Sequence, residues 1–247
     1  MIKMSQFTKI TLLLFMAGYI GCKTDNSFYS SGMPIPEVSS DDPATIPISR
    51  SDEEWWMERH IDRVESVVKN QKIILIGDSI TQGWVLSEAW RDLNKHYANK
   101  ITLLGFGADR TQNVIWRLEN GEFPSGIKPE NVILLIGTNN VDEPESIAAG
   151  IGRIIQIIHA NAPSANIYLM ALLPRGSGVN DEDTIRNYSV NKIIKNYDGY
   201  LNIHFMDIGD YFIDSNGQLI PELFTDNLHL SPLGYRLWKD KIIEKIE

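Results

Sequence analysis

The sequence predicts an α/β fold, a three-layer sandwich in which a five-stranded parallel sheet lies between two layers of helices. Two observations carry this prediction: short apolar runs recur along the chain, and segments with helical spacing lie between them. Runs that are apolar at successive positions, rather than at alternate ones, are typical of parallel strands buried on both faces. Strands that alternate with helices favour a parallel sheet covered by helices.

Each expected element has its own pattern. The expected strands cover residues 72–77, 101–104, 131–137, 166–172 and 203–206. Helical patterns cover residues 111–120, 145–160 and 184–197, and a last helix runs from Pro232, a favoured first-turn residue, to about residue 246. A further helix is expected to open at Trp55, because Ser51 and Glu54 have the spacing of a capping box.

Length and composition limit the function classes. The chain has 247 residues, enough for one domain with a developed core. Its formal net charge is −9 and no cluster of Lys and Arg stands out, which disfavours a nucleic-acid partner. Cys22 is the only cysteine, so an internal disulfide and a multi-cysteine metal site are excluded. Phosphate-loop, dinucleotide-binding and HExxH motifs are absent, and we expect neither a metal nor a cofactor.

The first residues have the pattern of an export signal. Lys3 and Lys9 precede an apolar run over residues 10–20, which is too short to span a bilayer comfortably. Gly21 and Cys22 follow, and this arrangement resembles the signal of bacterial lipoproteins, in which the cysteine carries the lipid. We therefore expect residues 1–21 to be removed, Cys22 to be the lipid anchor, and the mature chain to be exported and held in the cell envelope. An ordinary secretory signal with a chance cysteine is the alternative.

Residues 22–50 are expected to form a flexible tether, and residues 51–247 the folded domain. The stretch before residue 51 is rich in Ser, Asp and Pro and lacks sustained periodicity. Such a composition offers little apolar surface to bury.

The chemistry is expected where the strands end, because parallel sheets bind ligands outside their carboxyl edge. The first strand is followed by Asp78 and Ser79, which places a hydroxyl at this edge and the Ser79 N–H at the start of a helix. Turn and helix-cap requirements alone also account for these residue types.

A serine nucleophile needs a base, and the base needs an orienting group. Among five histidines, His229 stands out because it lies in a loop before the last helix, three residues after Asp226. A carboxylate at that offset can reach the imidazole and select its tautomer. The alternative is a plain turn with a solvated histidine.

Two further strand ends carry polar or glycine-rich sequence. Asn139 and Asn140 follow the third strand, where an amide N–H can stabilise an oxyanion, although Asn is also a common turn residue. Gly105 and Gly107 follow the second strand and indicate a close approach of the backbone.

Together these blocks resemble the SGNH (GDSL) hydrolase family over the stretch from about Trp55 to the end, and that family has the flavodoxin-like α/β/α fold. The resemblance is carried by Gly77-Asp78-Ser79, Gly107-Ala108-Asp109, Gly137-Thr138-Asn139-Asn140 and Asp226-x-x-His229, in that order. Within the family the chain is most similar to the branch of the platelet-activating-factor acetylhydrolase catalytic subunits. The segments that carry this closer similarity are Val114–Glu122, Ile136–Asn140 and Leu172–Gly176.

The resemblance implies a role for each matched position. Ser79 is the implied nucleophile, His229 the general base and acid, and Asp226 the group that orients His229. The implied oxyanion donors are the N–H groups of Ser79 and Ala108 and the side-chain amide of Asn139. Alanine stands at position 108 where the family has glycine, and we expect that this position does not need a positive φ. Asp78, Asp109 and Asn140 are expected to contact substrate.

The implied function is a serine esterase, an SGNH/GDSL carboxylic ester hydrolase without cofactor, which acts on a small-molecule or glycan ester. Short-chain esters, above all acetyl groups on carbohydrate, are the first expected substrates. A lipid ester, of the lysophospholipase or platelet-activating-factor acetylhydrolase type, is the second. A non-catalytic surface-binding lipoprotein and an envelope-assembly lipoprotein are the rival classes. The oligomeric state is left open.

Overall fold

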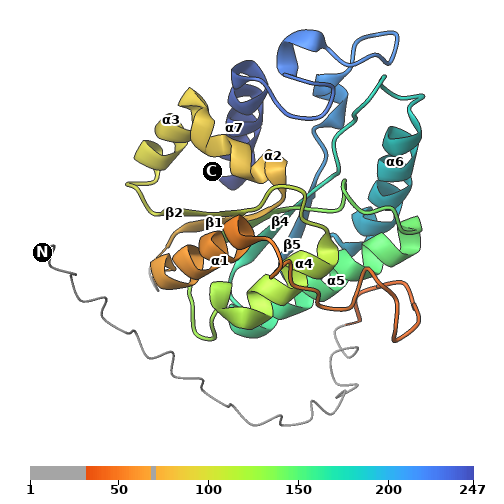
Figure 1. Cartoon of the computed structure of the whole chain (residues 1–247). Coiled ribbons are helices and arrows are strands. Elements are labelled where there is room, and N and C mark those ends of the chain that lie inside the picture. Colours follow the sequence, from red (N-terminus) through yellow and green to blue (C-terminus); the bar gives the residue numbers. More distant parts are fainter. Residues whose placement is uncertain (1–31, 68–70) are drawn as a thin grey trace, which may run out of the picture. The chain divides into compact units, whose positions relative to one another are not determined.

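The computed structural model describes residues 32–67 and 71–247 and has the predicted five-stranded parallel sheet between helices (Figure 1). The strand order is β2-β1-β3-β4-β5, with every neighbouring pair parallel. The strands are β1 (Ile73–Gly77), β2 (Ile101–Gly105), β3 (Asn131–Leu135), β4 (Asn166–Met170) and β5 (Ile203–Met206). The prediction of fold class is confirmed, and each expected strand is found to within two residues at either end.

The helices form two layers, one on each face of the sheet. Figure 1 shows α1 (Glu54–Ser66), α4 (Thr111–Arg117) and α5 (Pro144–Asn161) on one face, and α3 (Glu88–His96) and α7 (Pro232–Ile246) on the other. Helix α6 (Glu182–Ile194) packs beside α5. The shorter helical segments are α2 (Ser79–Gln82), η2 (Gly83–Leu86), η3 (Leu118–Glu122), η4 (Lys195–Tyr197), η5 (Gly209–Phe212) and η6 (Pro221–Leu223). The segments α2, η2 and α3 escape the sequence pattern because they are short: α2 has Gly83 as its C-cap, and η2 has Ser87.

The strand order switches sides at β1, and this switch creates the site. Strand β1 lies between β2 and β3, and Gly77 is in register with both Gly105 and Leu135. The segments that follow these three strands therefore emerge at one edge of the sheet, at a topological switch point. Gly77 is required there, because a Cβ on it would lie 2.2 Å from Oγ1 of Thr81 and 2.3 Å from the Leu135 carbonyl oxygen.

The structure corrects the expected start of the domain, because residues 33–50 pack onto it. Ala44 is fully buried, and its carbonyl oxygen accepts a hydrogen bond from Oγ1 of Thr111 at 2.8 Å. The Ile48 backbone N–H donates to the Gln112 carbonyl oxygen at 3.1 Å, and the Ile48 carbonyl accepts from Asn113 at 3.0 Å. Hydrogen bonds to the first turn of α4 thus hold residues 33–50 in a defined conformation, which their composition does not predict. The expected signal (1–21), Cys22 and tether residues up to 31 lie outside the described residues.

Helix α1 also begins differently from the expectation. Its N-cap is Glu53 and has no side-chain capping bond, so the capping box of Ser51 and Glu54 does not form.

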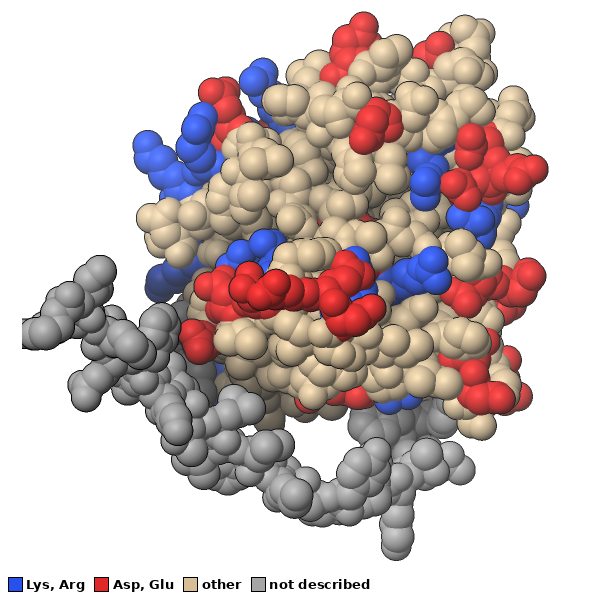
Figure 2. Space-filling model, viewed as in Figure 1, with Lys and Arg blue, Asp and Glu red and all other residues tan. Residues whose placement is uncertain are grey.

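On the face shown in Figure 2, acidic side chains gather in a row over α1 with Lys and Arg beside them. The exposed acidic residues of this helix are Glu54, Glu58, Asp62 and Glu65. Within the described residues, no helix has both the length and the apolar character needed to cross a membrane.

Candidate active site

Ser79, His229 and Asp226 form one hydrogen-bonded chain at the carboxyl edge of the sheet. The Nε2 atom of His229 lies 2.9 Å from Oγ of Ser79, although the two residues are 150 positions apart in the sequence. On the other side of the ring, Nδ1 of His229 lies 2.8 Å from Oδ2 and 3.1 Å from Oδ1 of Asp226. This is the arrangement of nucleophile, base and orienting carboxylate that serine hydrolases use.

A tight turn holds the imidazole in place. The Thr225 backbone N–H donates to the His229 carbonyl oxygen at 2.8 Å, and Oδ1 of Asp226 accepts the His229 backbone N–H at 2.7 Å. Asn227, at φ +39°, allows the chain to reverse inside the turn. Ser231 then caps α7 by accepting the N–H groups of Leu233 and Gly234. Partial burial raises the pKa of Asp226, but the hydrogen bonds from His229 outweigh it and hold that pKa below its ordinary value.

Ala108 adopts the left-handed conformation, with φ +59°, so the expectation that this position would not need a positive φ is wrong. A non-glycine residue in this region costs about 1–2 kcal/mol. Ala108 is exposed, and its N–H donates to no acceptor within the described part of the chain. The N–H is therefore available to a ligand.

Asn139 joins the second and third strand ends. Its Nδ2 atom donates to the Asp109 carbonyl oxygen at 3.0 Å, which uses one of the two amide hydrogens and leaves the second available. The structure thus brings the residue next to Ala108 into contact with the amide expected to face an oxyanion. The side chain of Gln82 adds a further tie, because its Oε1 accepts the Gly107 N–H at 2.6 Å.

The three residues expected to contact substrate are instead internal supports. Asp78, Asp109 and Asn140 are each completely buried. Asn140 accepts the Thr111 N–H at 3.0 Å and donates to Oγ1 of Thr111 at 3.0 Å, so it holds the start of α4. Asp78 caps α2 by accepting the Ile80 N–H at 2.9 Å. The sequence placed them correctly at the strand ends but could not tell which side of the chain their side chains would take.

Asp109 is the centre of a buried charged network that the sequence did not reveal. Its Oδ2 accepts from Nε of Arg117 at 2.8 Å, and its Oδ1 accepts from Nε1 of Trp56 at 2.7 Å and from Arg50 at 3.1 Å. Burial raises the pKa of Asp109, and the charge of Arg117 and the Trp56 bond oppose that rise. Arg117 also contacts Glu122, whose Oε1 lies 2.9 Å from Nδ1 of buried His60.

One signal for this network was present in the sequence. Arg117 and Glu122 lie within the segment Val114–Glu122 that carries the closer family resemblance. A charged pair inside an apolar helical pattern indicates a buried ion pair as readily as a solvated face. Arg50 gave no such signal, because it lies in the stretch expected to be a tether.

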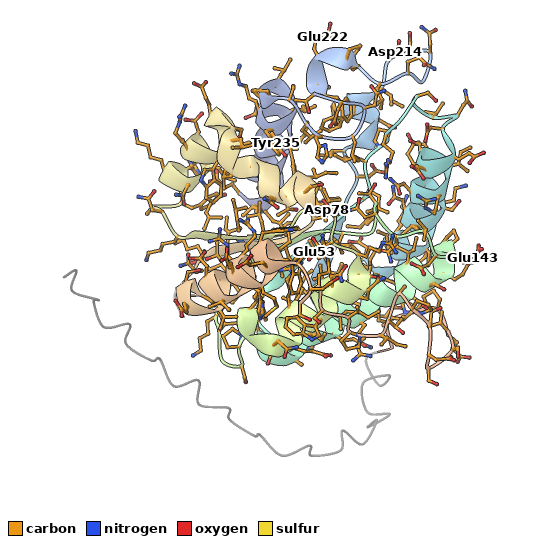
Figure 3. All side chains as sticks on the ribbon, in the orientation of Figure 1. Glu53, Asp78, Glu143, Asp214, Glu222 and Tyr235 are labelled. Carbon is orange, nitrogen blue, oxygen red and sulfur yellow. The ribbon has the colours of Figure 1, made fainter. Side chains whose placement is uncertain are left out.

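Asp78 makes stability depend on pH. Burial raises its pKa to about 7, the Asp109 carboxylate acts in the same direction, and the Ile80 hydrogen bond opposes both. Its Oδ2 atom has no hydrogen-bond partner among the described residues. In an unfolded chain the same carboxyl has a pKa of about 3.9. Figure 3 shows Asp78 next to the sheet, with Tyr235 on α7. Burial also raises the pKa of Tyr235.

The sign of this dependence follows from the two pKa values of Asp78. Between about pH 4 and pH 7 the unfolded chain releases the proton while the folded chain keeps it, so the stability contribution falls as pH rises. Asp78→Asn keeps an acceptor for the Ile80 N–H but has no titrating group. Relative to the wild type, we expect its free energy of unfolding to rise by up to about 4 kcal/mol between pH 4 and pH 8. Urea unfolding of both proteins at the two pH values measures this. A constant difference between them at both pH values would contradict it.

A cavity of about 540 Å³ opens beside Ser79 and His229. Its polar lining includes Gln82, Ser87 and Thr225, and no Lys, Arg, Asp or Glu of the described residues lines it. Leu86 is 88% exposed and stands at its edge. The apolar walls come from Val85, Leu86, Leu230, Pro232 and Tyr235.

Elsewhere in the described chain, no group of three or more His, Cys, Asp or Glu side chains is placed to hold a metal ion.

Comparisons with known proteins agree with the fold and the residue pattern. The model of the GDSL-like lipase/acylhydrolase family matches residues 75–237. The chain is 35% identical over 197 residues to platelet-activating factor acetylhydrolase IB subunit alpha1 of Rattus norvegicus, covering 78% of this chain and 82% of the relative. It is also 35% identical over 201 residues to subunit alpha2 of Mus musculus, covering 78% and 85%.

Solved structures share the architecture at lower identity. A GDSL-like lipase from Bacteroides thetaiotaomicron superposes with a TM-score of 0.65 at 19% identity, covering 76% of this chain and 96% of that one. An acetyl xylan esterase superposes with a TM-score of 0.58 at 20% identity, covering 71% and 99%. These likenesses show the fold, while the family match and the 35% identical relatives show the class. The chain belongs to the GDSL-like lipase/acylhydrolase family and is a carboxylic ester hydrolase.

Proposed function

We propose that the protein hydrolyses short-chain esters, above all acetyl esters, through an acyl-enzyme formed on Ser79. The observation that carries the mechanism is the continuous chain from Oγ of Ser79 through the imidazole of His229 to Asp226, with links of 2.9 and 2.8 Å. In this arrangement the imidazole can take the serine proton only if Nδ1 carries the other proton, and the carboxylate of Asp226 stabilises that tautomer.

The reaction follows in two halves. His229 accepts the proton of Ser79 as Oγ attacks the ester carbonyl carbon, and the carbonyl oxygen becomes an oxyanion. His229 then protonates the leaving alcohol as the carbon–oxygen bond breaks, which leaves the acyl group on Ser79. Water, deprotonated by His229, attacks the acyl-enzyme and releases the acid with the serine regenerated.

The oxyanion is assigned to three donors: the N–H groups of Ser79 and Ala108 and the second amide hydrogen of Asn139. Three features support this assignment. The Ala108 N–H has no acceptor among the described residues, and Asn139 keeps one amide hydrogen unused. The side chain of Asn139 is also bonded to the carbonyl oxygen of Asp109, the residue that follows Ala108. Donors held rigidly in this way stabilise developing charge without reorganising.

Acetyl specificity is supported by the relatives, which are named as acetylhydrolases of platelet-activating factor. For the alcohol part, O-acetylated carbohydrate is the proposal that follows from the expected export and from anchoring through Cys22 in the cell envelope. A lipid ester is a second candidate, favoured by one observation: the cavity beside Ser79 has apolar walls, and no Lys, Arg, Asp or Glu of the described residues lines it. Hydroxyl-rich ligands gain little from such walls, while hydrocarbon does.

The test of the mechanism is labelling with a fluorophosphonate probe, which reacts only with an activated serine. We expect one modified peptide, the one that contains Ser79, and loss of esterase activity in proportion to labelling. Activity that persists after complete labelling of Ser79, or a protein that is neither labelled nor active, would overturn the proposed function. The second outcome would favour the non-catalytic binding role.

Acyl and alcohol preference can be separated with two series of esters. We expect kcat/KM for p-nitrophenyl esters to be highest for acetate and to fall with acyl length. Acetylated xylo-oligosaccharide, compared with a long-chain alkyl acetate at equal concentration, then decides the alcohol part. Faster release of acetate from the oligosaccharide would support carbohydrate, and faster release from the alkyl ester would support the lipid alternative.

A further inference from the structure

Ala108 lies between two residues whose backbone groups are all held by other parts of the chain. The Gly107 N–H is bound to Gln82, and the Asp109 N–H donates to the Phe106 carbonyl oxygen at 3.2 Å. The Asp109 carbonyl accepts from Asn139. The remaining group, the carbonyl of Gly107, accepts from Nη1 of Arg50 at 2.6 Å.

Arg50 is itself fixed in position. Its Nε and Nη2 atoms donate to the two carboxylate oxygens of Glu53, each at 2.8 Å, which is the bidentate geometry that gives Arg its directional strength. Its Nη1 atom reaches both Gly107 and the Asp109 carboxylate, so one guanidinium spans the two residues that flank Ala108. The side chain is 17% exposed and lies over the Trp55 ring, with Cζ 5.2 Å from the ring centroid. Figure 3 shows Glu53 just before α1.

The Gly107 carbonyl and the Ala108 N–H belong to the same peptide group. A trans peptide is planar, and its C=O and N–H bonds point in opposite directions. A cation that holds the carbonyl on one side therefore fixes the direction of the N–H on the other. It also polarises the peptide group, which makes the N–H a stronger donor. The family usually has glycine at this position. Alanine is strained at φ +59°, so Ala108 needs this restraint more than a glycine would.

We propose that Arg50 is a positioning residue of the oxyanion hole, which aims the Ala108 N–H by holding the Gly107 carbonyl. The inference rests on the proposed function, since it assigns the Ala108 N–H to the oxyanion. Arg50 lies outside residues 75–237, the part that the family model matches, and within the stretch whose composition predicted a tether. The segment before α1 would then be part of the catalytic apparatus.

The test is the full chain with Arg50→Met, compared on p-nitrophenyl acetate. We expect kcat to fall about tenfold with KM nearly unchanged, because the donor acts on the transition state and a misdirected N–H loses part of the 10²–10³-fold effect of an oxyanion donor. A trifluoromethyl ketone forms a tetrahedral oxyanion adduct on serine, and its Ki should rise by the same factor. Arg50→Lys, which can still reach the carbonyl with one donor, should recover part of the loss. Glu53→Gln should show a smaller loss in the same direction.

Arg153→Met is the matched control, since Arg153 is a half-exposed arginine paired with Glu119 and is not bonded to the 107–109 loop. Its kcat and Ki should equal those of the wild type. A kcat and Ki for Arg50→Met that match the control, or a fall in kcat with an unchanged Ki, would overturn the inference. Failure of the proposed function is separate, because it would appear in the wild type as hydrolysis that does not depend on Ser79.

Discussion

Ser79→Ala is expected to lower kcat for p-nitrophenyl acetate by about 10⁴–10⁶-fold, since it removes the atom that forms the acyl-enzyme. The oxyanion donors and the cavity are untouched in this variant. We therefore expect a residual rate above that of the uncatalysed hydrolysis in water, from binding and electrostatic stabilisation alone. Steady-state kinetics with enzyme at micromolar concentration measure the residual rate. KM should change little, because the Ser79 hydroxyl contributes less to substrate binding than to the reaction.

Two controls make this result specific to Ser79. Ser189→Ala removes a partly buried helical serine whose hydroxyl donates to the Ile185 carbonyl oxygen, and its activity should be that of the wild type. Circular dichroism and thermal unfolding should show that Ser79→Ala folds normally, because among the described side chains this hydroxyl is hydrogen-bonded only to His229. A variant that is folded and still active on the ester would remove Ser79 from the mechanism.

Asp226→Asn is expected to be more damaging than Asp226→Ala, which reverses the usual order of conservative and drastic changes. Oδ1 of Asp226 accepts the His229 backbone N–H at 2.7 Å, so an asparagine must place its oxygen there. Its NH₂ group then faces Nδ1 of His229, where Oδ2 now lies at 2.8 Å. A donor at that point selects the tautomer with the proton on Nε2, which cannot accept the Ser79 proton.

The expected loss for Asp226→Asn is about 10⁴-fold in kcat, the scale known for a wrong tautomer. For Asp226→Ala we expect a loss about tenfold smaller. The Asp226 side chain is 60% exposed, so water can replace the carboxylate as acceptor for the Nδ1 proton. Asp214→Asn is the matched control, because Asp214 accepts the N–H groups of Asn216 and Gln218 in a similar turn without a histidine. Equal losses for the two Asp226 variants would contradict the tautomer argument.

Local pattern was sufficient for much of the molecule. A parallel strand buried on both faces must be apolar at successive positions, so β1 to β4 could be read directly from their apolar runs. The edge strand β5 is shorter, and its two middle residues are only partly buried. Ser79, Asn139 and the turn from Asp226 to His229 were placed at strand ends or before a helix by their neighbours alone. The prediction that Asp226 orients His229 needed only a turn, and in the structure Oδ2 of Asp226 lies 2.8 Å from Nδ1 of His229.

Other predictions failed where long-range contacts decide the outcome. Residues 33–50 have the composition of a tether, but hydrogen bonds to Gln112 and Asn113 hold this stretch on the domain. Position 108 carries an alanine with a positive φ, and Arg50, Gln82 and Asn139 bind the backbone groups of its two neighbours. No sequence window contains those partners together.

By itself, then, the sequence determined the sheet, the family and the order of the catalytic blocks, because these depend on residue type and spacing within short segments. Only the tertiary structure decided that Asp78, Asp109 and Asn140 turn inward, that Arg50 reaches the loop before Ala108, and that an apolar cavity opens beside Ser79. The physical reason is that side-chain direction and burial at the end of a strand depend on whichever distant group supplies a hydrogen bond or excludes water. Those groups meet only when the chain has folded.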